Sequence, residues 1–186
     1  MPSRYTFNDL LGLLVFSRKY HFIHSDLDRL IIAWAEDQIT EGNHSETLLI
    51  LASLGLDNQP ERTEVELYMS RYMAEQRIDL PPLKEAALVW IKLFVRQLSQ
   101  CVSIHDAEQK MCFLVCHWFE PDVKIFTAVV DTLKSLYWHL FDEWEGSGTS
   151  EAARMDESEF FELIHRTMLP YSRKIENPDW LVLLVR

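Results

Sequence analysis

Apolar side chains recur at steps of three and four residues along most of this chain, and this spacing is the feature that most restricts its fold. The clearest case lies between residues 126 and 144, where the apolar positions are Phe126, Val129, Val130, Leu133, Leu136, Tyr137, Leu140, Phe141 and Trp144. Such a period places the side chains along one face of an α-helix, whereas a half-buried strand would alternate at every second residue. The stretch therefore predicts one long amphipathic helix.

The same period predicts about eight helices, with starts near residues 7, 26, 45, 60, 82, 106, 121 and 157. Ser45 and Asp156 are suited to N-caps, because a short side chain can accept a hydrogen bond from the free N–H groups of a first helical turn. Gly55 is expected to end the third helix in a left-handed conformation, and Pro170 to end the last helix.

Short connections and the absence of a constant period predict an all-α fold, an irregular bundle or stack of about eight antiparallel helices. The 186 residues are expected to form a single helical domain over residues 1–186. Within it we expect a flexible acidic loop at about 145–155. An apolar C-terminal tail at 179–186 is compatible with a short extended segment, docked on the domain or shared in a homodimer through Trp180 to Val185.

The net charge of −11 repels nucleic-acid phosphates and anionic lipids, so neither nucleic acid nor a membrane is an expected partner. No apolar run reaches the roughly 18 residues of a membrane-spanning helix. Three cysteines are an odd number and do not indicate a disulfide framework. A cytoplasmic location is expected, and no cofactor.

Two sets of residues resemble metal ligands by type. Cys101, His105, Cys112 and Cys116 are spaced by 4, 7 and 4 residues, but ligands along one straight helix cannot close a tetrahedron, and residues 103–106 indicate a helix break. We expect Cys112 and Cys116 to be buried and inert.

The second set is Glu162 and His165, a Glu-x-x-His pair, which is half of the ligand set of a di-iron bundle. The second Glu-x-x-His of the chain, Glu41 and His44, spans the helix end expected at Gly42 and Asn43, so its two side chains are not expected to lie along one helix. The chain has no glycine-rich phosphate loop and no Gly-x-Ser-x-Gly motif, so no catalytic residue is assigned.

Acidic side chains concentrate between residues 141 and 162, where eight carboxylates face one cation, Arg154. A solvated loop is one interpretation. The other is an acidic surface with aromatic anchors that binds a basic protein. Its residues would be Phe141, Asp142, Glu143, Trp144, Glu145, Glu151, Asp156 and Glu157.

Residues 33–54, AWAEDQITEGNHSETLLILASL, resemble a helix-turn-helix segment of small bacterial proteins, some of them encoded near secreted toxins. The resemblance implies no catalytic residue. The leading hypothesis is a non-enzymatic protein-binding module, in its most concrete form an acidic inhibitor or a toxin-neutralising, immunity-like protein. Two alternatives stay open: a small helical metalloprotein or hydrolase, and a structural or regulatory subunit of a homo-oligomer.

Overall fold

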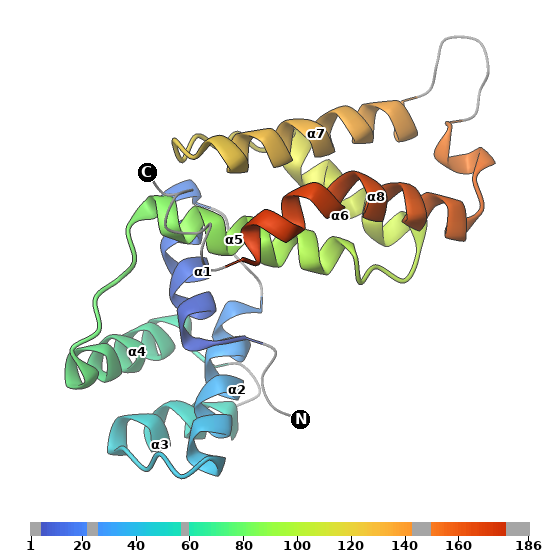
Figure 1. The fold of residues 1–186 in the computed structure, drawn as a ribbon. Helices are drawn as coiled ribbons and strands as arrows, with labels where there is room; N and C mark the ends of the chain where they lie inside the picture. The colour runs from blue at the N-terminus through green and yellow to red at the C-terminus, as the bar shows by residue number, and fades with distance from the viewer. Residues whose placement is uncertain (1–4, 22–25, 57–59, 143–149, 178–186) are drawn as a thin grey trace. The chain divides into compact units, whose positions relative to one another are not determined.

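The computed structural model describes residues 5–21, 26–56, 60–142 and 150–177 (Figure 1). These residues form eight α-helices and two short 3₁₀-helices, and the described ranges contain no strand. The prediction of an all-α protein with about eight helices is confirmed. The expected extended segment at 179–186 lies outside the described residues.

The chain divides into two compact units, Met1–Ala86 and Ala87–Arg186, and each is described by itself. The expectation of one domain over residues 1–186 stays a prediction.

Unit 1 contains α1 (Phe7–Tyr20), α2 (Leu27–Thr40), α3 (Glu46–Ser53), the 3₁₀-helix η1 (Leu54–Leu56) and α4 (Arg62–Gln76). Helix α2 packs against each of the other four elements. The buried side chains at these contacts recur at helical spacing, as the sequence period predicts. They include Leu10, Ile31, Leu48, Leu51, Val65 and Met69, each without exposed surface.

Local capping fixes the starts of two of these helices. Thr6 and Asp9 form a capping box, in which each side chain accepts a hydrogen bond from the other residue's backbone N–H. The Ser45 hydroxyl accepts from the Leu48 N–H at 3.1 Å, so the predicted N-cap of α3 is confirmed.

The prediction that Gly55 is a left-handed C-cap is wrong. Gly55 lies inside η1, and among the described glycines only Gly42 has a positive φ, at 98°. The reason for a glycine at 55 is space. A Cβ there would lie 2.8 Å from Cγ2 of Ile32 and 2.9 Å from Oε1 of Glu36, both on α2.

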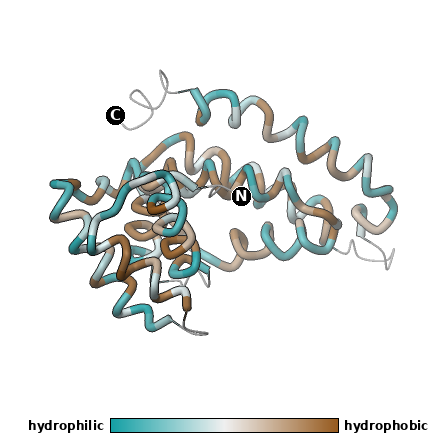
Figure 2. Tube along the Cα trace, turned by 90° about the horizontal axis from the view of Figure 1, so that it is seen from below, coloured by the Kyte–Doolittle hydropathy of each residue, from teal (hydrophilic) through white to brown (hydrophobic). Residues whose placement is uncertain are grey.

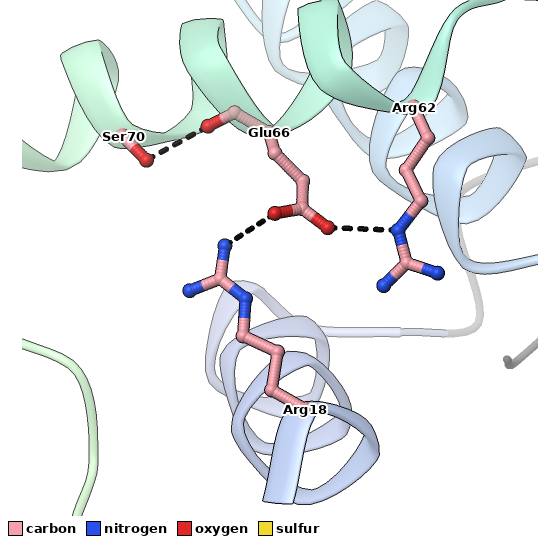
Figure 3. A network of polar contacts seen from close by, with 4 residues as sticks. All are labelled: Arg18, Arg62, Glu66 and Ser70. Carbon is pink, nitrogen blue, oxygen red and sulfur yellow. Dashed lines mark hydrogen bonds and ion pairs between the residues drawn. The ribbon is translucent and has the colours of Figure 1, made fainter. Parts of the chain in front are cut away.

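An ion-pair network joins α1 to α4 (Figure 3). The Arg18 guanidinium donates to one carboxylate oxygen of Glu66 at 2.6 Å, and Arg62 donates to the other at 2.8 Å. The Ser70 hydroxyl donates to the Glu66 backbone carbonyl at 2.7 Å. Glu66 therefore tethers the last turn of α1 to the first turn of α4.

Unit 2 contains most of α5 (Leu83–Leu98), then α6 (Ile104–Cys116), α7 (Lys124–Phe141), the 3₁₀-helix η2 (Ala152–Arg154) and α8 (Glu157–Ile175). Helix α7 packs against α6 and α8. Trp90 of α5 lies between 5.1 and 6.3 Å, centroid to centroid, from four phenylalanine rings, those of Phe94, Phe113, Phe119 and Phe126. Figure 2 shows hydrophobic positions recurring at helical intervals along the chain, alternating with hydrophilic ones.

The prediction that Pro170 ends the last helix is also wrong, because α8 continues through it to Ile175. A proline inside a helix removes one backbone hydrogen bond and crowds the carbonyl four residues earlier. The helix nevertheless continues on both sides of Pro170, where Met168 and Ile175 are 4% and 1% exposed. Burial of these side chains outweighs the local cost of the proline.

Candidate functional site

The outward side of α7 carries a row of exposed and half-buried side chains, Lys134, Trp138 and Asp142. Together with Trp118 we call this row the α7 face. Residues 134, 138 and 142 follow one another at steps of four, so they lie along one side of the helix and its C-cap. The Trp138 side chain is 52% exposed, and Trp118, from the connection between α6 and α7, is 76% exposed.

Lys134 holds Trp118 against α7. Its Nζ atom lies 5.6 Å from the centroid of the Trp118 ring, a cation–π contact. The same ammonium group donates to the backbone carbonyl of His117 at 3.2 Å. Two contacts from one lysine therefore fix the residues next to the helix connection.

A groove of about 580 Å³ opens beside this end of the α7 face. Its walls combine aromatic rings, three carboxylates and one ammonium group. The lining residues are Trp118, Phe119, Glu120, Asp122, Thr127, Val130, Asp131 and Lys134. A groove with this lining favours a ligand group that is cationic and carries an apolar stem.

The other end of the α7 face is acidic. Asp142 is the exposed C-cap of α7, and Glu157 is exposed in the first turn of α8. The rings of Phe141 and Phe160, 6.0 Å apart, bring these two helix ends together. We call Asp142, Glu151, Asp156 and Glu157 the acidic end of unit 2.

Two residues of the acidic end have local partners. Glu151 pairs with Arg154 at 3.7 Å. Asp156 is the N-cap of α8, and its carboxylate accepts from the Glu159 N–H at 2.8 Å, so the predicted cap is confirmed. A carboxylate at a helix N-terminus is also favoured by the helix dipole.

Of the four neighbouring contact residues expected from the sequence, at positions 141, 143, 144 and 145, the structure describes only Phe141. The Phe141 ring is half-buried, 5.3 Å from the ring of Tyr137, so much of its surface is already used within unit 2. Glu143, Trp144 and Glu145 lie outside the described residues. The proposed contacts of all four with a partner stay predictions.

The sequence analysis did not include the two exposed tryptophans, Trp118 and Trp138, among the candidate anchors. Trp138 falls one position away from the apolar stripe of α7, next to Tyr137 of that stripe. Trp118 follows the last helical residue of α6, Cys116. The offset of Trp138 is a signal that the sequence contains, whereas the position of Trp118 beyond the end of α6 is known from the structure.

The metal candidates do not come together as one site. The described residues contain no group of three or more His, Cys, Asp or Glu side chains that could hold a metal ion. His105 is exposed, 3.6 Å from Glu108 and 3.0 Å from Gln109. Glu162 and His165 are both exposed on α8.

The three cysteines lie at two places: Cys101 stands apart, and Cys112 and Cys116 lie close together. Cys101 lies in the break between α5 and α6, and Ser103 is the N-cap of α6. The break expected at 103–106 therefore lies earlier, at 99–103, and residues 104–106 form the first turn of α6. Burial raises the pKa of the Cys101 thiol to about 12, with further contributions from Asp106. Cys112 and Cys116 lie together on α6, but Cys112 is half-buried and Cys116 is exposed. The expectation that both are buried is wrong.

Comparison of the chain with protein-family models, with curated proteins and with solved structures finds no match. In the described part of the chain, no helix combines the length and the apolar character needed to cross a membrane.

Proposed function

We propose that this chain is a non-enzymatic protein-binding module that contacts a basic partner protein through the α7 face and the acidic end of unit 2. The observation that carries the proposal is the exposure of two tryptophans, 76% for Trp118 and 52% for Trp138, on one surface. Large exposed aromatic side chains beside charged groups are typical of the central anchors of interfaces.

The two parts of this surface have different roles in the proposal. Trp118 and Trp138 lose their remaining water contact when a partner covers them, so they stabilise the bound state. The carboxylates of Asp142, Glu151 and Glu157 remain nearer to solvent, where charges mainly steer the approach of a partner. A basic partner is favoured because the net charge of the chain is −11.

The most concrete form of the proposal is an acidic inhibitor, such as a toxin-neutralising, immunity-like protein. An inhibitor of a nuclease needs a surface that replaces phosphates, and carboxylates with neighbouring aromatic rings supply the matching charge and contact area. A cationic side chain of the partner would fill the groove next to Trp118 and Asp131.

The test is capture of partners by the immobilised native chain, followed by association and dissociation kinetics on each captured protein. Trp118→Ala and Trp138→Ala should each raise the dissociation rate by about tenfold or more, as expected for hot-spot residues. Circular dichroism must show unchanged helix content in both variants.

Leu56→Ala is the matched control, because Leu56 is an apolar side chain that is 88% exposed in unit 1. It should leave both rates unchanged. If Leu56→Ala and Trp138→Ala slow or speed binding equally, or if both tryptophan variants bind like the native chain, the α7 face is not the interface.

A further inference from the structure

A pair of free thiols lies at the C-terminal end of α6. The Sγ atoms of Cys112 and Cys116 are 3.8 Å apart, because residues four apart are neighbours on one side of a helix. Cys116 is exposed and Cys112 is half-buried. A small ligand can therefore reach both sulfur atoms from one side.

Tyr137 of α7 completes the surroundings of this pair. Its hydroxyl lies within hydrogen-bonding reach of Cys112. A phenol hydroxyl can donate a hydrogen bond to sulfur. A hydrogen-bond donor next to a sulfur ligand is the usual way in which a protein orients and stabilises a thiolate bound to a metal.

We propose that Cys112 and Cys116 bind one soft monovalent metal ion of the copper(I) type through their two sulfur atoms. Thiolates are the ligands that such ions prefer. Each thiol releases its proton to water as a metal–sulfur bond forms, so two protons leave, two metal–sulfur bonds form and no electron is transferred. This site is distinct from the α7 face and does not depend on the proposed function.

The number of ligands favours copper(I) over zinc. A structural zinc ion needs four protein ligands, and within the described ranges no group of three His, Cys, Asp or Glu side chains is available. Copper(I) accepts two thiolates in a nearly linear arrangement. A linear arrangement places the two sulfurs farther apart than the observed 3.8 Å, and a rotation of the exposed Cys116 side chain supplies the difference.

The position on the helix also favours a cation. Cys116 is the last residue of α6, where the helix dipole is negative and the last carbonyl groups lack partners within the helix. Glu108, one turn before Cys112, adds a carboxylate to the charges around the pair. A bound monovalent cation reduces the repulsion between the two thiolates and these negative groups.

The experiment is a titration of the full chain with copper(I), under reducing and oxygen-free conditions, in competition with a coloured copper(I) chelator. Silver(I) serves as a second probe with no redox chemistry. We expect one ion per chain for each probe. Cys112→Ser and Cys116→Ser should each lower the affinity by at least about a hundredfold, since one of two sulfur ligands is lost.

Cys101→Ser is the matched control, because the Cys101 thiol donates to the Gln97 carbonyl at 3.5 Å and belongs to no pair. It should keep the native stoichiometry and affinity. Tyr137→Phe should weaken binding by about tenfold, the lower end of the effect of removing an outer hydrogen bond to a metal ligand.

Three results would overturn the proposal: copper(I) that stays with the chelator, unchanged affinity in Cys116→Ser, or equal loss in Cys101→Ser. Zinc bound as tightly as copper(I) would overturn the two-coordinate assignment. Cys116 is exposed, so its serine variant is expected to fold, and circular dichroism checks this.

Discussion

Gly55 shows how one residue can be determined by a contact distant in the sequence. The position where its Cβ would lie is 2.8 Å from Cγ2 of Ile32, a side chain that is only 5% exposed. Ile32 is branched at Cβ and held in the core of unit 1, so it cannot easily move away. Glu36, the other close neighbour, is exposed and can rotate aside.

We therefore expect Gly55→Ala to lower the free energy of unfolding by about 1–3 kcal/mol, the usual cost of adding a methyl group to a packed site. Urea denaturation followed by circular dichroism measures this change. Ser53→Ala, at an exposed position of the preceding helix, is the control and should change stability by no more than about 0.5 kcal/mol. Equal stability of Gly55→Ala and the native chain would show that η1 can shift away from α2.

The charge of Glu66 links α1 to α4 within unit 1. Burial raises the pKa of Glu66, but hydrogen bonds from Arg62 and Arg18 outweigh that effect and hold the pKa below its usual value. A carboxyl with a lowered pKa in the folded state stabilises the fold above its unfolded pKa. That contribution is lost as the pH falls through the folded pKa.

Glu66→Gln should thus lower the free energy of unfolding by about 0.5–1 kcal/mol at pH 7, a modest value because all three side chains are partly exposed. The difference from the native chain should shrink as the pH falls below the ordinary carboxyl range, and also at high salt. Denaturation at several pH values measures both. Glu64→Gln, an exposed glutamate one turn from Glu61, should show no such trend; a constant difference for Glu66→Gln would point to packing instead of charge.

At the scale of single elements, the sequence predicts well what local chemistry decides. The caps Ser45 and Asp156 act on N–H groups three residues away, so composition alone identifies them. The end of α8 is decided differently. Burial of Met168 and Ile175 keeps the helix continuous through Pro170, and no local rule reports burial against another element.

The candidate site shows the same contrast between features that local sequence decides and features that packing between helices decides. The acidic end could be recognised in the sequence as a run of carboxylates, and the exposure of Trp138 could have been recognised from its offset from the α7 stripe. The approach of Phe141 to Phe160 and of Cys112 to Tyr137 joins residues on separate helices. These contacts depend on how the helices pack, which the periodicity of a single sequence does not specify.

Pro170 gives a prediction at this scale, because its position in α8 lacks a backbone donor and its side chain is exposed. Pro170→Ala should raise the free energy of unfolding by about 1–3 kcal/mol, since alanine restores the hydrogen bond to the carbonyl of Arg166 and loses no buried contact. Thermal and urea denaturation measure the change. Ser158→Ala, exposed in the first turn of the same helix, is the control for a general gain in helix propensity. A less stable Pro170→Ala would mean that the proline sets a bend on which the packing of α8 depends.

The whole molecule carries a net charge of −11, and this field acts on any charged partner before contact. Two features of the chain could direct a basic partner toward it: the total negative charge, and the carboxylates gathered at the acidic end. The total charge attracts a basic protein from any direction, whereas carboxylates gathered at one end of unit 2 attract it toward the α7 face. Charges act over roughly 8 Å at physiological ionic strength, so a local group is felt mainly at its own surface.

Two triple variants with the same change in net charge distinguish these explanations. One replaces Asp142 with Asn and Glu151 and Glu157 with Gln, at the acidic end. The other replaces three exposed glutamates of unit 1, Glu46, Glu61 and Glu64, with Gln. We expect the first variant to slow association with a captured basic partner by about tenfold at low salt and to flatten its dependence on salt, while dissociation changes little. The second should associate nearly as fast as the native chain. Equal slowing in both variants would assign steering to the total charge and leave the acidic end as a solvated surface.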